Sequence, residues 1–123
     1  MDAYDEVLYC LAQAHEHLIN ALKFSNADVS TRKRPVSIGK HVCLEKAEPY
    51  LAEARNILEQ LECQVKDTIS IQNTRLNLGK VNAFHDVYGD GLLTDFVVHL
   101  RIQKMVKAVE AAHKEIKKLK AKL

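Results

Sequence analysis

The stretch that decides the fold is VHLRIQKMVKAVEAAHKEIKKLKAKL, residues 98–123. Its apolar residues recur alternately four and three positions apart, at Val98, Ile102, Met105, Val109, Ala112, Ile116, Leu119 and Leu123. Side chains at that spacing lie along one edge of an α-helix, so the pattern predicts a helix that packs lengthwise against other helices. If this last helix begins near Leu92, it is about 45 Å long at the usual rise of roughly 1.5 Å per residue.

Two earlier stretches repeat the same spacing. The first set is Tyr4, Leu8, Leu11, His15, Leu18, Leu22 and Ser25, and the second is Leu44, Ala47, Leu51, Ala54, Leu58, Leu61 and Val65. We expect one helix over residues 3–25 and another that begins near 44–46, because this start keeps Pro49 in the first turn, where backbone amides are unpaired. The alternative is a start near His41 with a bend at Pro49.

Residues 69–88 are open to three interpretations. We favour a third helix, because Ile71, Leu78 and Val81 fall on one side of it. A hairpin would instead pair the segments 69–71 and 76–78, and a third possibility is that the second helix simply continues.

The predicted fold class is all-α. We expect an elongated up-and-down bundle of four helices, or alternatively of three long helices, with a long last helix and a single domain over residues 1–123. With 47% hydrophobic and 28% charged residues, the chain can bury a core without disulfides or metal, and its four Gly and two Pro leave few turns.

The residues between the first two helices, 26–40, read NADVSTRKRPVSIGK. They are rich in residue types that favour turns and caps, and they include one Pro and one Gly. The segment is therefore predicted to be a long basic loop, and loops of this length tend to be functional or disordered.

Localisation can be predicted from what the composition lacks. No apolar run approaches the roughly 18 residues that cross a bilayer, and the first residues are acidic rather than basic. Cys10, Cys43 and Cys63 are odd in number and form no CxxC pair, which favours neither a disulfide framework nor a zinc site. We expect a cytoplasmic protein with reduced thiols.

Charge is segregated along the chain. Residues 101–123 contain eight bases and only two acids, although the net charge of the whole chain is only +2. The favoured function is a non-enzymatic protein–protein interaction module, adaptor-like or self-associating, most simply as a dimer. The predicted contact residues lie on the apolar edge of the last helix: Val109, Ala112, Ile116 and Leu119.

The alternative function is RNA or DNA binding through basic residues. The candidate contacts are Arg32, Lys33, Arg34 and Lys40 in the loop, with Lys114, Lys117 and Lys118 in the last helix. Phosphate contacts of this kind make binding steeply salt-dependent. This alternative is less favoured because no aromatic residues stand beside these bases to stack on nucleotides.

A third possible function is that of a metal-dependent hydrolase. The acids Glu45, Glu48, Glu59 and Glu62 resemble, in spacing, the paired acidic motifs of all-helical nucleotide pyrophosphatases, a resemblance that implies magnesium binding. Both pairs fall on one predicted helix, however, about 20 Å from first to last, and acids that share one metal must lie close together. We therefore expect no metal or cofactor site and no catalytic residues.

Overall fold

The computed structural model describes residues 2–31, 34–64, 68–79 and 95–122. Within these ranges it describes the side chains except those of 26–31, 34–38, 68, 77, 79, 95 and 96. The described residues form four α-helices and no strand. The helices are α1 (Ala3–Thr31), α2 (Arg34–Glu62), α3 (Thr68–Gly79) and α5 (Asp95–Ala121).

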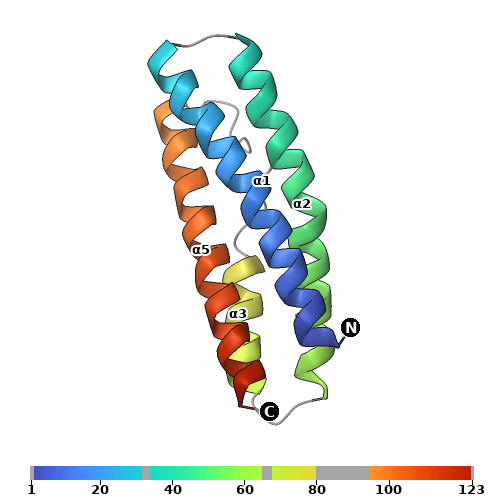
Figure 1. Cartoon of the computed structure of the whole chain (residues 1–123). Helices are drawn as coiled ribbons and strands as arrows, with labels where there is room; N and C mark the ends of the chain where they lie inside the picture. Colours follow the sequence, from blue (N-terminus) through green and yellow to red (C-terminus); the bar gives the residue numbers. More distant parts are fainter. Residues whose placement is uncertain (1, 32–33, 65–67, 80–94, 123) are drawn as a thin grey trace.

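The helices run alternately up and down in one elongated bundle (Figure 1). α1 contacts α2 and α5, and α3 contacts the same two helices from the other side, so α1 and α3 stand at opposite corners. α3 has only 12 residues against 27 to 29 in the others, and it lies at the end of the bundle where α5 terminates (Figure 1). The predicted all-α bundle of four helices is confirmed over the residues described above.

The prediction of a long loop over 26–40 is wrong. The backbone is helical up to Thr31 and again from Arg34, so only residues 32 and 33 separate the two helices. Pro35 lies in the first turn of α2, where a proline is well tolerated because that amide has no helical partner. Packing of the two helices against each other has overridden the turn-favouring composition.

Pro49 lies inside α2 rather than in its first turn, so the favoured start near 44–46 is also wrong. A proline at this position removes the hydrogen bond to the carbonyl of Glu45. Pro49 is on the exposed face of α2, where water can bond to that carbonyl instead. The helix therefore continues through a residue that usually ends one.

The remaining helix predictions are confirmed over the described residues. α5 matches the predicted long last helix, and α1 matches the predicted first helix but runs further. The predicted third helix over 69–88 is confirmed for residues 69–79, which excludes the hairpin there, while its remainder falls outside the described residues.

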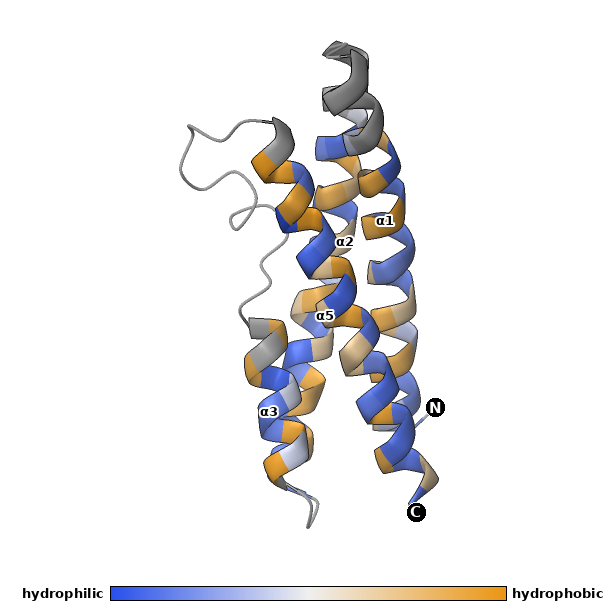
Figure 2. Cartoon of the chain, turned by 90° about the vertical axis from the view of Figure 1, so that its left-hand side faces the viewer, coloured by the Kyte–Doolittle hydropathy of each residue, from blue (hydrophilic) through white to orange (hydrophobic). Residues whose placement is uncertain are grey.

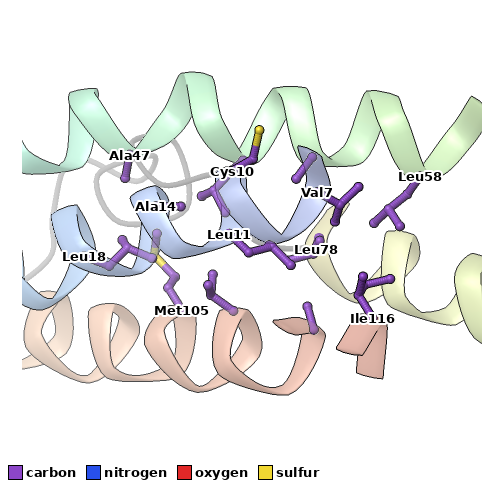
Figure 3. Close-up of a cluster of buried hydrophobic side chains, with 14 of the residues drawn as sticks. Val7, Cys10, Leu11, Ala14, Leu18, Ala47, Leu58, Leu78, Met105 and Ile116 are labelled. Atoms are coloured by element: carbon purple, nitrogen blue, oxygen red, sulfur yellow. The ribbon is translucent and has the colours of Figure 1, made fainter. Parts of the chain in front are cut away.

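One apolar core extends through all four helices (Figure 3). Leu11, Leu18, Leu58 and Ile116 are fully buried in it, together with Leu78 from α3. Figure 3 shows these side chains directed into the space between the ribbons. The apolar edge of α5 supplies seven buried residues of this core: Val98, Ile102, Met105, Val109, Ala112, Ile116 and Leu119.

The beginning of α1 is capped by its own sequence. The Asp5 amide donates a hydrogen bond to Asp2 Oδ1 at 2.9 Å, and the Glu6 amide donates to the Asp2 carbonyl at 3.0 Å. A side-chain oxygen at this position satisfies an amide that the helix leaves unpaired. The bond from the Asp5 amide lowers the pKa of Asp2.

None of the described helices combines the length and the apolar character that crossing a bilayer requires.

Candidate functional site

The four predicted contact residues of the last helix lie inside the protein. Val109 and Ile116 are 0% exposed, Ala112 is 5% exposed and Leu119 is 4% exposed. They pack against the other helices of the same chain and belong to its core. This placement corrects the predicted interface, because the apolar edge of α5 is already covered within one chain.

The predicted basic contacts whose side chains the structure describes do not converge. Arg32 and Lys33 fall outside the described residues, as does the side chain of Arg34. Lys40 is only 2% exposed, so it is removed from the surface on which a nucleic acid would lie. Lys114, Lys117 and Lys118 are exposed near the end of α5, whereas Lys40 lies near the beginning of α2. These two helix ends lie at opposite ends of the bundle (Figure 1).

The outer face of α3 carries two exposed apolar side chains where the predictions placed no site. Ile69 is 71% exposed, the largest exposed fraction among the large hydrophobic side chains described, and Leu76 is 48% exposed. The two residues are seven apart, which puts them two turns apart on the same side of the helix, about 10 Å from each other along its axis. Gln72 and Asn73, also exposed, lie between them. We call these four residues the α3 outer face.

The α3 outer face carries no charge. Its four members are the exposed side chains described on α3, and all are neutral, whereas the exposed faces of α1, α2 and α5 each include charged residues. Figure 2 shows α3 beside the lower part of α5, with apolar residues distributed along its short length. A neutral strip that carries two large exposed apolar side chains is the kind of surface that protein contacts use.

The inner face of α3 holds it firmly on the bundle. Ile71 and Leu78 are fully buried, and Thr74 is only 5% exposed. The Thr74 hydroxyl donates a hydrogen bond to the Ser70 carbonyl of the same helix at 2.8 Å, so this buried polar group has a partner. The exposure of Ile69 and Leu76 is therefore not the result of a helix detached from the core.

Two arginines connect α3 to α2. Arg75 Nε donates to Glu62 Oε1 at 2.7 Å, and Arg55 Nη1 donates to the Leu78 carbonyl at 3.3 Å. The bond to Glu62 raises the pKa of Arg75. Glu62 is thus engaged in an ion pair, which takes one of the four acids away from a magnesium site.

Polar contacts also connect α1 to α5. His15 Nε2 lies 3.2 Å from Glu110 Oε2, Lys120 pairs with Asp5, and His99 Nδ1 lies 3.2 Å from the buried hydroxyl of Ser25. These pairs fix how α5 lies along α1. The histidines and acids in these pairs therefore stabilise the packing of α1 against α5, and they lie at separate places along the two helices.

Burial shifts the pKa of one histidine and two cysteines. Burial, with help from Lys117 and His15, lowers the pKa of His113. Burial raises the pKa values of the Cys10 and Cys43 thiols, which makes each a weaker nucleophile at neutral pH. Among the described residues no group of three or more His, Cys, Asp or Glu side chains is placed to hold a metal ion.

An aromatic row lies across α1 and α2. The Tyr50 ring stacks on His17 at 5.8 Å between centroids and meets the edge of Tyr9 at 6.4 Å. Pairs with this geometry add to packing between the helices, so the row is assigned to the fold.

The signal for the α3 outer face was present in the sequence. Ile69 and Leu76 are seven residues apart, and Ile71 and Leu78 repeat that spacing on the opposite side of the same helix. A short helix that is apolar on two opposite sides can bury only one of them against its own bundle.

No family model, no curated protein and no solved structure matches this chain. Over the residues that the structure describes, the protein is a bundle of four helices, and α3 presents a neutral surface with two exposed apolar side chains.

Proposed function

We propose that this protein is a non-enzymatic protein–protein interaction module that self-associates through the α3 outer face. The observation that carries the proposal is the 71% exposure of Ile69 beside Leu76 on a helix whose inner side is fixed in the core. Exposing a large apolar side chain to water is unfavourable, and a partner that covers it gains that free energy.

The geometry of α3 suits a second copy of the same chain. The midpoint between Ile69 and Leu76 falls between Gln72 and Asn73. If a twofold axis passes there, two antiparallel α3 helices bring Ile69 of each copy against Leu76 of the other. Since the face is neutral, two identical copies do not repel one another there.

The size of the face sets the strength of this contact. Full burial of a Leu or Ile side chain contributes roughly 1.5–3 kcal/mol, while association costs at least about 4 kcal/mol. A stable dimer usually buries about 800 Å² per partner, more than one 12-residue helix offers. We therefore expect a weak dimer, with a Kd between about 10 µM and 1 mM.

Sedimentation equilibrium over a concentration series tests the proposal. From about 10 µM to about 1 mM, the wild-type protein should rise from the monomer mass toward the dimer mass. The variant I69S/L76S should stay monomeric and folded with a small loss of Tm, because Ile69 is 71% exposed and Leu76 is 48% exposed. The matched control V42S/L100S removes two exposed apolar side chains from α2 and α5 and should associate like the wild type.

Two results would refute self-association through α3. One is a wild-type protein that is monomeric at the highest concentration, and the other is an I69S/L76S variant that associates as strongly as the control.

The cytoplasm is the proposed compartment. Cys10, Cys43 and Cys63 are all free thiols, and a reducing environment keeps them so.

A further inference from the structure

A second surface runs along the side of α5 that faces away from the core. Its members are exposed and recur alternately four and three residues apart: Leu100, Lys104, Lys107, Ala111, Lys114 and Lys118. This spacing places them in one line about 27 Å long. We call this line the α5 outer seam.

The α5 outer seam is basic over most of its length. Four of its six members are lysines, and Lys117 is exposed beside it. The acid nearest the middle of the seam, Glu110, is directed to His15 on α1, and Glu115 is only partly exposed. Lysines three and four residues apart on a helix repel one another, so a ligand that brings negative charge relieves a repulsion already present.

The seam also offers apolar contact. Leu100 is 42% exposed, and Ala111, a residue small enough to let another helix approach closely, interrupts the row of lysines. The alkyl stems of lysines add apolar surface on either side while their ammonium groups reach outward. This mixture of charge and apolar contact matches the face of another helix.

We propose that the α5 outer seam docks an acidic amphipathic helix of a partner protein, about 18 residues long, whose glutamates and aspartates face the seam lysines. Charge complementarity selects the partner and its orientation, and Leu100 and Ala111 contact its apolar residues. Together with the α3 outer face, this gives the protein two distinct contact surfaces, as an adaptor requires.

A protein partner fits the seam better than a nucleic acid. The six seam residues include no aromatic ring on which a base could stack and no arginine to pair with a phosphate in bidentate fashion. Leu100 and Ala111 have no counterpart along a phosphate backbone. We therefore treat nucleic-acid binding as an outcome of the test.

The test uses the full chain and a labelled synthetic helical peptide of about 20 residues, rich in glutamate with leucine at every seventh position. Fluorescence anisotropy at low salt should show binding that weakens steeply as salt is raised. The variant K107E/K114E should bind the peptide about tenfold more weakly or worse. The control K23E/K46E changes net charge by the same amount at exposed lysines of α1 and α2, and should bind within about threefold of the wild type.

Two further probes complete the experiment. A peptide with the leucines replaced by serine, at equal charge, should bind more weakly than the first, since it lacks the contacts with Leu100 and Ala111. A random DNA duplex of about 20 base pairs should bind more weakly than the leucine-containing peptide.

The proposal is overturned if the wild type fails to bind the peptide at low salt, or if K23E/K46E loses as much affinity as K107E/K114E. It is also overturned if the DNA duplex binds more tightly than the peptide, or if the serine peptide binds as well as the leucine peptide. The I69S/L76S variant should bind the peptide normally, so failure here is distinguishable from failure of self-association.

Discussion

Arg75 of α3 donates a hydrogen bond from Nε to Glu62 Oε1 of α2 at 2.7 Å, and this ion pair sits at the edge of the proposed contact surface. The pair joins the shortest helix of the bundle to the end of a helix of 29 residues. Because α3 has few turns, each such tie to its neighbours contributes to how rigidly it presents Ile69 and Leu76.

The variant R75A should loosen α3 without unfolding the bundle. Loss of the ion pair leaves α3 held by Ile71, Leu78 and the bond from Arg55, so its backbone amides should exchange with solvent faster while those of α1 do not change. Hydrogen-exchange mass spectrometry measures this. The control Q72A, which truncates an exposed residue of the same helix, should leave exchange in α3 unchanged, and equal acceleration in both variants would contradict a role for the pair.

Two nearby residues of α5 should lose very different amounts of stability when they are truncated. Ile102 is 0% exposed and Leu100 is 42% exposed. I102A should therefore lower the free energy of unfolding by about 2–5 kcal/mol, and L100A should change it by less than about 0.5 kcal/mol. Urea denaturation of the two variants checks the assignment of the inner and outer sides of α5, and similar losses for both would refute it.

The sequence predicted the buried side of α5 because burial follows helical periodicity. Every apolar position of the α5 ladder up to Leu119 is buried, and Leu123 lies outside the described residues. Periodicity shows which side of a helix is apolar, but it does not show what covers that side. For this reason the residues Val109, Ala112, Ile116 and Leu119 were assigned to a partner, whereas helices of the same chain cover them.

Local composition gave the wrong prediction at the α1–α2 junction, because composition also does not show how helices pack together. Residues 26–40 contain the types that favour turns, yet most of the segment is helical because the two long helices pack together. The α3 outer face was not predicted, because the favoured helix over 69–88 was given one apolar side, that of Ile71 and Leu78. Which of two apolar sides faces the core depends on packing between helices, which the sequence does not display.

Gly39 and Phe24 should be energetically coupled at that junction. A Cβ added at Gly39 would lie 2.7 Å from Cε1 of the Phe24 ring, which is too close, so the ring would have to shift. In the wild-type background G39A should lower stability by about 1 kcal/mol, because the clash outweighs the better helix propensity of alanine. In an F24A background G39A should instead be stabilising, by up to about 1 kcal/mol.

A double-mutant cycle with thermal and urea denaturation measures this coupling. If G39A has the same effect in both backgrounds, the close approach of α1 and α2 at this point is contradicted.

The Asp2 cap should give stability a dependence on acid pH. The hydrogen bond from the Asp5 amide lowers the pKa of Asp2 from its ordinary value of 3.8, so the ionised carboxylate stabilises the folded state above that value. The contribution should disappear as pH falls through the lowered folded-state pKa. D2A should therefore have a lower Tm than the wild type at neutral pH, and the two should converge in acid.

The variant D2N is the control for this prediction. Asparagine keeps an oxygen that accepts the Asp5 amide but cannot ionise, so D2N should keep part of the stability at neutral pH. A difference between wild type and D2A that is the same at neutral and strongly acidic pH would show that the charge of Asp2 plays no part.

The most direct test of self-association through α3 is an assigned amide NMR spectrum of the wild-type protein recorded at about 1 mM and again after dilution to about 20 µM. The proposal predicts that dilution shifts the amide signals of residues 69–76, with the largest changes at Ile69 and Leu76, and that the I69S/L76S spectrum does not change on dilution. Spectra that are identical at both concentrations, or changes confined to α1, α2 and α5, would contradict it.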